Sequence, residues 1–378
     1  MNILMLPSWY RDAKHPGAGS FFLEQAQALA GAGHRVDLLF CYDDAKGKTW
    51  REQRTNGLVK EHFIHYQKRS MRWDTLKTAY LIARFILSCP KEAKPDILHV
   101  QSYPAMRYVL LIQWLVRLPT VITEHLSLFG LKKLSARQLR KASRCFSGAD
   151  EVYAVSEGLK SCIQPLCKTP VQVIPNTVSS LFFDRPLPEN KTGPFTFVSI
   201  GTLNDNKGFD VLLSAFQKSF AGRSDIRLVI LGQGPNREEL ESLSKDLDID
   251  AQVEFKGEVS REVCADTLLN AHAFVLSSRY ETFGVVYGEA MACGLPIIMT
   301  ETSAFQSLVT PVTGYSVPID DVDALSAKMV LLYENYASFN GENIRAFCRE
   351  NFSEQAFAEK LMERYRAVLK KRQERTQR

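Results

Sequence analysis

The chain has 378 residues, of which 45% are hydrophobic and 24% charged, so it can bury a large core and is long enough for about two domains. The longest apolar run, residues 108–121, contains Arg117 and Pro119 and is shorter than the roughly 20 residues that a transmembrane helix needs, which argues against an integral membrane protein. Residues 1–190 carry 26 Lys and Arg against 16 Asp and Glu, whereas residues 191–378 carry 21 against 26. The two halves are therefore expected to meet different partners.

The opening MNILMLPSWY lacks the basic leader, apolar core and cleavage site of a signal peptide. None of the eight cysteines lies in a C-x-x-C pair or in a Cys/His spacing typical of zinc. We therefore expect a cytoplasmic protein with reduced thiols.

The N-terminal segment predicts a βαβ unit. Its strand, helix and second strand are residues 3–6, 21–30 and 36–40. The loop HPGAGS before the helix contains Gly17 and Gly19, which let the backbone approach a phosphate or a sugar closely. The loop lacks the third glycine of the dinucleotide fingerprint and is too long for that tight turn.

Two segments, residues 70–87 and 131–144, are predicted to be basic amphipathic helices. Such helices can lie on anionic lipid headgroups, and a solvated helix face is the equally weighted alternative. Two short β-rich runs, residues 96–100 and 120–123, are each followed by polar side chains. Because ligands bind at the carboxyl ends of parallel strands, we single out His125, which follows Glu124, as a candidate site residue.

Residues 182–194 contain several prolines and are predicted to be a linker. The strand–helix alternation then begins again with FTFVSIGTL at residues 195–203. Two doubly wound parallel sheets are expected, one in residues 1–185 and one in residues 186–353. The last residues, 354–378, are predicted to form a basic helix that returns to the first domain.

The stretch ETFGVVYGE, residues 281–289, follows an apolar strand and leads into an Ala/Met-rich helix. The backbone N–H groups of residues 283–286 at the helix start would suit a phosphate. Eight residues at about 100° each bring Glu281 and Glu289 to within roughly 80° of one direction, so both carboxylates can border one site. We expect Glu289 to bind the diol of a ribose and Glu281 the hydroxyls of a sugar.

The chain resembles the family 4 retaining glycosyltransferases, and the resemblance covers nearly its whole length. The motifs that carry it are GTLNDNKGFDVLLSAF (201–216), LGQGP (231–235), ETFGVVYGEAMACGLPII (281–298) and TGYSVP (313–318), with HPGAG, TEHLS and VIPN as weaker matches. The resemblance implies the α/β GT-B fold, two Rossmann-like domains facing across a cleft. It also implies that the C-terminal domain binds a nucleotide sugar and the N-terminal domain binds the acceptor.

The resemblance implies roles for single residues. Lys207 resembles the diphosphate-binding lysine, Glu289 the ribose carboxylate, Glu281 the acid at the transferred sugar, and His125 the active-site histidine. Further positions that resemble donor contacts are Gly17, Gly19, Val259, Phe283, Gly284 and Val285. Where many members have a second phosphate cation, this chain has Thr202, and Arg279 is the candidate replacement.

We expect a retaining transfer that needs no cofactor and no metal, in which Lys207 and the 283–286 N–H groups stabilise the leaving diphosphate and His125 and Glu281 orient the reactants. Asp248 and Asp250 mimic a metal-binding D-x-D motif but fall in an acidic turn. Other GT-B enzymes, such as an epimerase or a phosphorylase, and a non-catalytic binding subunit remain alternatives. The expected partners are a nucleotide sugar, a glycan or lipid-linked acceptor in polysaccharide or lipopolysaccharide assembly, and the anionic inner membrane surface, but no nucleic acid.

Overall fold

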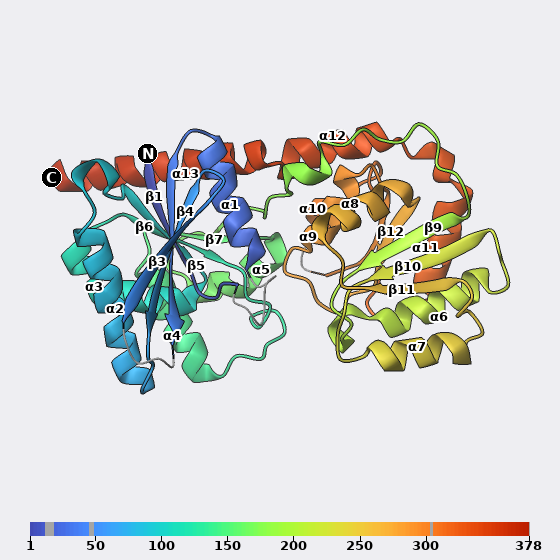
Figure 1. Cartoon of the computed structure of the whole chain (residues 1–378), viewed down its shortest axis with the longest axis horizontal. Helices are drawn as coiled ribbons and strands as arrows, with labels where there is room; N and C mark the ends of the chain where they lie inside the picture. Colours follow the sequence, from blue (N-terminus) through green and yellow to red (C-terminus); the bar gives the residue numbers. More distant parts are fainter. Residues whose placement is uncertain (12–18, 45–48, 303–304, 378) are drawn as a thin grey trace. The chain divides into compact units, whose positions relative to one another are not determined.

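The computed structural model describes residues 1–11, 19–44, 49–302 and 305–377, and the chain forms two compact units (Figure 1). Unit 1 comprises Met1–Thr177 together with the C-terminal residues from Glu354 onward, and unit 2 is Val178–Ser353. Each unit is built around a largely parallel sheet with helices, as the alternation of strands and helices predicted.

The sheet of unit 1 has eight strands in the order β3-β4-β2-β1-β5-β6-β7-β8, all parallel except for the antiparallel pair β3 and β4. The sequence analysis did not predict the β3–β4 hairpin, in which Gly57, with a φ of 56°, opens the two-residue turn between Asn56 and Val59. The strands are β1 Asn2–Pro7, β2 Arg35–Asp43, β3 Trp50–Asn56, β4 Val59–Tyr66, β5 Ile97–Gln101, β6 Thr120–Glu124, β7 Glu151–Ala154 and β8 Gln172–Val173.

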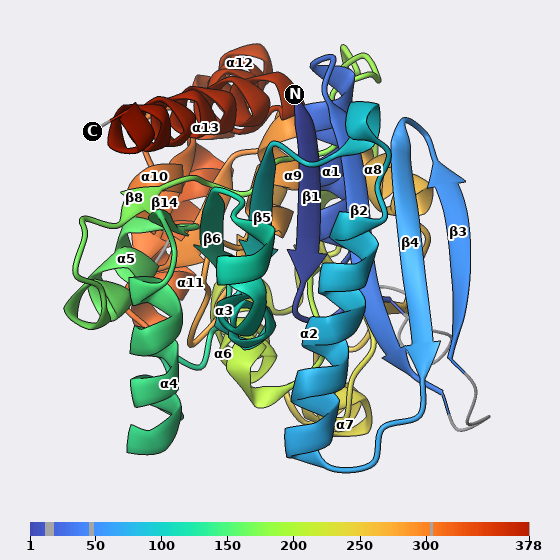
Figure 2. The same cartoon turned by 90° about the vertical axis from the view of Figure 1, so that its left-hand side faces the viewer.

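Helices cover both faces of this sheet (Figure 2). Helices α1 and α13 pack against each other, and their apolar side chains form one core with Ile3, Met5 and Ile97 of the sheet. The opposite face is covered by α2, α3 and α4, with α3 between the other two. The helices of unit 1 are α1 Ser20–Gly31, α2 Met71–Leu87, η1 Lys91–Ala93, α3 Tyr103–Val116, α4 Ala136–Ser147, α5 Glu157–Ile163, η2 Gln164–Leu166 and α13 Glu354–Gln377.

Helix α4 is shorter than predicted. It begins at Ala136, where Ser135 and Gln138 form a reciprocal capping box. Lys132 and Lys133 lie before this cap, and Lys132 has a φ of 53°, so they are not part of the helix.

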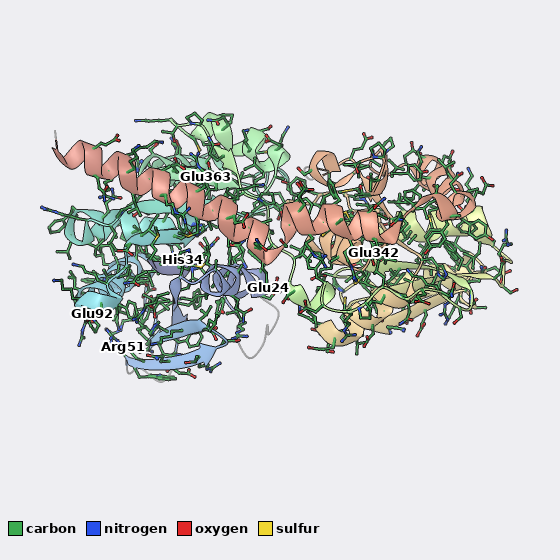
Figure 3. The ribbon with its side chains drawn as sticks, turned by 90° about the horizontal axis from the view of Figure 1, so that it is seen from above. Glu24, His34, Arg51, Glu92, Glu342 and Glu363 are labelled. Carbon is green, nitrogen blue, oxygen red and sulfur yellow. The ribbon has the colours of Figure 1, made fainter. Side chains whose placement is uncertain are left out.

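Helix α13 is the long helix that carries Glu363 in Figure 3. It packs on the rest of unit 1 through its apolar face and through charged contacts. Arg364 donates two hydrogen bonds to the carboxylate of Glu151, at 2.7 and 3.0 Å. Lys371 also contacts Glu151, and Arg372 contacts Asp150. Three basic residues of the tail are therefore engaged by acids of the same unit.

The sheet of unit 2 has six parallel strands in the order β11-β10-β9-β12-β13-β14. They are β9 Phe195–Ile200, β10 Ile226–Leu231, β11 Val253–Gly257, β12 Ala273–Leu276, β13 Ile297–Thr300 and β14 Gly314–Val317. The helices are η3 Ser180–Phe182, η4 Asp205–Lys207, α6 Phe209–Phe220, α7 Arg237–Asp246, α8 Arg261–Asn270, α9 Val285–Ala292, α10 Phe305–Leu308, α11 Val322–Glu334, η5 Tyr336–Ser338 and α12 Gly341–Phe352.

The predicted boundary between residues 185 and 186 lies inside unit 2. Val178 donates its N–H to the carbonyl of Phe352 at 2.7 Å, and Phe182 and Phe183 are buried. Arg261 lies over the ring of Phe182. The segment that the prolines marked as a linker thus begins with residues that belong to the core of unit 2.

Candidate active site

The loop between β12 and α9 leads into the helix as predicted, because α9 starts directly after ETFG. Gly284 has a φ of 75°, and a Cβ there would lie 2.6 Å from the ring of Tyr287. Tyr287 is fully buried and its hydroxyl donates to the carbonyl of Leu276 at 2.9 Å. The ring cannot move away, so the turn requires glycine. Helix α9 begins at Val285, and its first N–H groups have no acceptor within the helix.

Lys207 and Glu281 form an ion pair in unit 2. Lys207 ends η4, and its Nζ contacts Oε1 of Glu281. The hydroxyl of Ser278 donates to the same oxygen at 3.0 Å. Glu281 is buried, and the methylene groups of Lys207 lie against Gly201, where a Cβ would be 3.4 Å from them. A lysine and a carboxylate are thus held together at the carboxyl ends of β9 and β12.

Gly208 fixes the position of Lys207. It has a φ of 64°, and a Cβ there would lie 2.2 Å from the carbonyl oxygen of Ser277. The hydroxyl of Ser277 donates to the carbonyl of Gly208 at 2.6 Å. The loop that carries Lys207 is therefore fastened to the residue that follows β12, and a side chain at position 208 would separate the two.

A cavity of about 420 Å³ lies beside this ion pair, at the carboxyl ends of β9, β10 and β11. Glu289 is buried at its wall, and its Oε1 is 3.1 Å from a guanidinium nitrogen of Arg261. The lining residues are Phe182, Ile200, Gly201, Thr202, Leu231, Gly232, Gln233, Glu258, Val259, Arg261, Cys264 and Glu289. The predicted residues Thr202, Val259 and Glu289 thus meet in one cavity.

Glu281 does not line this cavity together with Glu289. Glu281 lies against Lys207 instead, so the prediction that both carboxylates border one site stays a prediction. Gly201 connects the two features, since it lines the cavity and also contacts the Lys207 side chain. The two acids therefore occupy adjoining places with different partners.

His125 of unit 1 belongs to a chain of buried polar side chains. Its Nε2 is 2.7 Å from Oε1 of Gln101. Gln101 donates to Gln25 at 3.1 Å, and Gln25 donates to Asn176 at 3.0 Å. This direction of donation makes Nε2 the protonated nitrogen of His125 and leaves Nδ1 as an acceptor.

His125 is neutral at physiological pH. Burial, with a smaller contribution from the nearby His99, lowers the pKa of His125 to about 3. The rings of Phe21 and Phe22 lie against the imidazole, with centroids 5.0 and 5.3 Å away. A neutral imidazole with a free acceptor can receive a hydrogen bond but cannot supply a positive charge.

Glu124 has a structural role beside His125. Its carboxylate accepts backbone N–H bonds from Tyr103, His125 and Leu126 at 2.9–3.0 Å. Burial raises the pKa of Glu124. The residue fixes the start of α3 and the peptide of His125.

Gly19 and Gly17 were predicted to contact the donor. Gly19 precedes α1 with a φ of 70°, and a Cβ there would lie 2.9 Å from the ring of Phe22. Gly17 lies outside the described residues.

Comparison with known proteins decides the family. The model for glycosyl transferases group 1 matches residues 183–363, and the model for glycosyltransferase family 4 matches residues 16–180. The chain belongs to glycosyltransferase family 4. The resemblance found in the sequence is thereby confirmed.

Named relatives of this family 4 glycosyltransferase act on phosphatidylinositol lipids according to their names. The gpi3 subunit of phosphatidylinositol N-acetylglucosaminyltransferase from Schizosaccharomyces pombe is 27% identical over 328 residues, which are 82% of this chain and 69% of the relative. A human relative, also named as part of phosphatidylinositol N-acetylglucosaminyltransferase, is 26% identical over 78% of this chain and 60% of its own length. The chain thus spans about two thirds of the length of these relatives.

Solved structures confirm the GT-B fold. Sucrose-phosphate synthase from Thermosynechococcus elongatus superposes with a TM-score of 0.77 at 20% identity, covering 97% of this chain and 99% of the other. The lipopolysaccharide outer core galactosyltransferase WaaB superposes with a TM-score of 0.72 at 18% identity, covering 98% and 100%.

Arg279, the candidate replacement for the missing phosphate cation, is paired with acids of unit 2. Its guanidinium donates to both carboxylate oxygens of Asp210, at 2.6 and 3.1 Å, and to Asp320 at 2.7 Å. It also contacts the carbonyl of Asp205. Its hydrogen bonds to Asp210 connect the β12–α9 loop to the first turn of α6.

Arg261 is a site residue that the sequence analysis missed. It is the first residue of α8, directly after the capping Ser260. A cation at a helix N-terminus is unfavourable for the helix dipole, so an arginine at this place signals a partner elsewhere. That partner is Glu289.

The Phe283 side chain is core rather than site. It is buried and meets the ring of Phe352 edge-on at 5.5 Å. A ligand at this position would therefore contact the backbone of Phe283, as proposed for the backbone of Gly284 and Val285 at the start of α9.

Asp248 and Asp250 lie before β11, at the end of the strand opposite to the cavity. The described residues contain no group of three or more His, Cys, Asp or Glu side chains arranged to hold a metal ion. In the described part of the chain, every helix is too short or too polar to span a bilayer.

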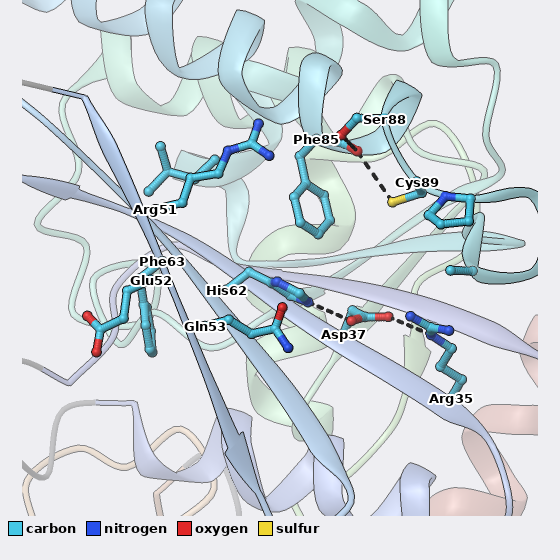
Figure 4. Close-up of a pocket in the computed structure, with 13 residues that line it drawn as sticks. Arg35, Asp37, Arg51, Glu52, Gln53, His62, Phe63, Phe85, Ser88 and Cys89 are labelled. Carbon is cyan, nitrogen blue, oxygen red and sulfur yellow. Dashed lines mark hydrogen bonds and ion pairs between the residues drawn. The ribbon is translucent and has the colours of Figure 1, made fainter.

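A second cavity of about 340 Å³ lies in unit 1, between the end of α2 and the strands β2, β3 and β4 (Figure 4). Asp37 forms its centre, with Nε2 of His62 at 2.6 Å and Nε of Arg35 at 3.0 Å. Asp37 and Arg35 are near the start of β2, whereas ligands of such sheets bind where the strands end. We do not assign the active site to it.

Proposed function

We propose that this protein is a retaining glycosyltransferase that transfers a sugar from a nucleotide-diphosphate sugar without a metal. The observation that carries the proposal is the ion pair of Lys207 and Glu281 beside the cavity that contains Glu289. A cation for the diphosphate, a carboxylate for sugar hydroxyls and a carboxylate for ribose lie side by side.

The proposed donor position follows from these contacts. The nucleoside occupies the cavity, where Glu289 accepts hydrogen bonds from the ribose diol and the backbone at Val259 contacts the base. Arg261 holds the Glu289 carboxylate in place. The diphosphate lies at Lys207 and the first N–H groups of α9, where the helix dipole favours negative charge.

In the proposed reaction, the diphosphate displaces Lys207 from Glu281 and takes over the ammonium group. Glu281 is then free to accept hydrogen bonds from the sugar hydroxyls. Stabilising the leaving diphosphate lowers the barrier of a front-face transfer, and no cofactor takes part. His125 is the unit 1 group that we propose orients a reacting hydroxyl through its Nδ1 acceptor.

We propose a glycan or lipid-linked acceptor at the cytoplasmic face of a membrane, in polysaccharide or lipopolysaccharide assembly. The relatives named for phosphatidylinositol N-acetylglucosaminyltransferase support a lipid acceptor. The exposed Arg137, Arg140 and Lys141 of α4 support attraction to anionic headgroups. The tail supports it less than its charge suggested, because Arg364, Lys371 and Arg372 are paired with acids.

A non-catalytic binding subunit is the second candidate. One observation favours it. Thr202 supplies no positive charge and Arg279 is paired with Asp210 and Asp320, which leaves Lys207 as the cation beside Glu281.

Slow hydrolysis of the donor in the absence of acceptor separates the two candidates. A panel of UDP- and GDP-sugars is incubated with the protein, and release of the nucleoside diphosphate and the anomer of the released sugar are measured. An enzyme of the proposed type hydrolyses one donor with retention. Tight binding of a donor without hydrolysis, even with lipid extracts added as acceptor, would favour the binding subunit.

A further inference from the structure

Helices α2 and α3 carry large apolar side chains on their outer faces. Of the twelve exposed large hydrophobic residues in the described part of the chain, seven lie on these two helices. They are Trp73, Leu76, Tyr80 and Leu87 on α2, and Leu111, Trp114 and Leu115 on α3. We call these seven residues the apolar face.

The fold does not account for the apolar face. Helix α2 buries Ala79, Ile82 and Ile86 on its inner side, and α3 buries Met106, Val109 and Ile112. The outer positions of α2 follow one another at helical spacing, so they form a continuous stripe. Trp73 and Trp114 are each 72% exposed, which is unusual for the largest apolar side chain.

The two helices are in contact, so the exposed residues belong to neighbouring elements. Apolar side chains scattered singly over a surface need no explanation, but seven on two neighbouring helices mark an interaction site.

The charges around the apolar face are almost all positive. Basic side chains lie exposed among the apolar ones and on the neighbouring α4. They are Arg72, Lys77 and Arg84 on α2, Arg107 on α3, and Arg137, Arg140, Lys141 and Arg144 on α4. The acid within these three helices is Asp74, and it accepts the backbone N–H of Arg69 at 2.9 Å.

We propose that the apolar face inserts into the headgroup region of an anionic lipid bilayer. Tryptophan and tyrosine favour that region because their rings are apolar and their N–H and O–H groups stay hydrated. Lysine and arginine beside them reach the lipid phosphates while their methylene groups lie along the acyl chains. An anionic bilayer offers an apolar interior and negatively charged phosphates at once, whereas a protein partner would need an apolar surface surrounded by acidic side chains.

This inference rests on the proposed function in one respect, namely that the protein works at an anionic membrane. It adds that apolar side chains of the protein enter the bilayer, so that binding does not depend on charge alone. It also adds that α3 contacts the bilayer, although α3 lies outside the two basic segments of the sequence.

The test uses vesicles of phosphatidylglycerol whose acyl chains are brominated, because bromine quenches tryptophan fluorescence only on close approach. The full-length protein is compared with the double variant Trp73→Ser/Trp114→Ser. The matched control is Leu58→Ser, which removes a 71%-exposed apolar side chain at the β3–β4 turn. We expect quenching of the wild type and of Leu58→Ser. In the double variant we expect vesicle binding weaker by about tenfold or more.

Three results would overturn the inference. One is equal vesicle binding by the wild type and the double variant; another is binding without quenching. The third is a dimer of the wild type in sedimentation that the double variant does not form, because the apolar face would then join two copies. Donor hydrolysis is measured on the same samples. Unchanged hydrolysis with a failed quenching test rejects the insertion and leaves the transferase proposal standing, whereas lack of hydrolysis in the wild type rejects the transferase proposal itself.

Discussion

Nζ of Lys207 contacts Oε1 of Glu281, a residue 74 positions further along the chain. Each of the two loops that carry them follows a strand of the unit 2 sheet, and Gly208 against Ser277 holds the loops together. In the proposed mechanism the two partners are exchanged: a diphosphate takes the lysine, and sugar hydroxyls take the carboxylate.

Lys207→Ala should slow transfer strongly. The variant removes the cation that faces two phosphate charges in the proposed transition state, and losing such a contact is worth about 2 to 4 kcal/mol, hence roughly 30-fold or more in kcat/KM. Lys218→Ala is the matched control, since Lys218 pairs with the exposed Asp323 away from the loop. Donor hydrolysis at wild-type rate in Lys207→Ala would exclude the assignment.

Glu289→Gln and Glu281→Gln should separate binding from chemistry. Glu289 is proposed to bind the ribose, so its amide should weaken nucleoside diphosphate binding by about tenfold while leaving kcat less affected. Glu281 is proposed to meet the sugar, so its amide should lower kcat with little change in nucleoside diphosphate binding. Calorimetry with the nucleoside diphosphate measures the first effect. Equal affinity of wild type and Glu289→Gln would remove the ribose role.

Activity should survive EDTA. In the proposed mechanism Lys207 and the α9 N-terminus neutralise the leaving diphosphate, so no divalent ion has to bridge it. Donor turnover is compared before and after dialysis against EDTA. Complete loss that Mg²⁺ or Mn²⁺ restores would contradict the mechanism and bring Asp248 and Asp250 back into consideration.

The buried histidines should destabilise the fold in acid. Burial lowers the pKa of His99 to about 3, as it does for His125, whereas an unfolded histidine titrates near about 6.5. The unfolded chain therefore binds more protons below pH 6.5. The contribution of the neutral histidines to the free energy of unfolding is therefore fully present above that pH. It falls as the pH drops, by up to about 1.4 kcal/mol per pH unit for each histidine. Denaturant unfolding of wild type and His125→Asn between pH 7.5 and 5 checks this. The variant should lose stability less steeply, and parallel curves would show that His125 is not neutral in the fold.

The basic residues of α4 should contribute to vesicle binding, and the paired residues Lys371 and Arg372 of α13 should not. Changing Arg137, Arg140 and Lys141 to Ser removes exposed charges worth roughly 1 kcal/mol each near an anionic surface. Changing Lys371 and Arg372 instead breaks ion pairs inside unit 1 and should mainly lower stability. Co-sedimentation with phosphatidylglycerol vesicles and thermal unfolding measure the two effects. Equal vesicle binding by the α4 variant would show that its charge is incidental.

Much of the fold was determined by the sequence itself. The repeated change from apolar runs to helical periodicity predicted two parallel sheets, and the strand, loop and helix around residues 281–289 were correct. These features are local: a period of two or 3.6 residues and a glycine at a turn are written in neighbouring positions. Glu289 could be singled out for the same reason, from its spacing along the helix, whereas Lys207, Thr202 and Val259 were singled out through the resemblance to family 4.

Partnerships between distant residues were decided by the tertiary structure alone. The engagement of Arg279 by Asp210 and Asp320, the pairing of Arg261 with Glu289 and the bonding of the tail to Glu151 each join side chains far apart in the chain. Local patterns carry no information about which acid neutralises which base. The same holds for the polar chain that runs from His125 through Gln101 and Gln25 to Asn176, because its members come from four separate segments that only the folded sheet and helix α1 bring into hydrogen-bonding distance.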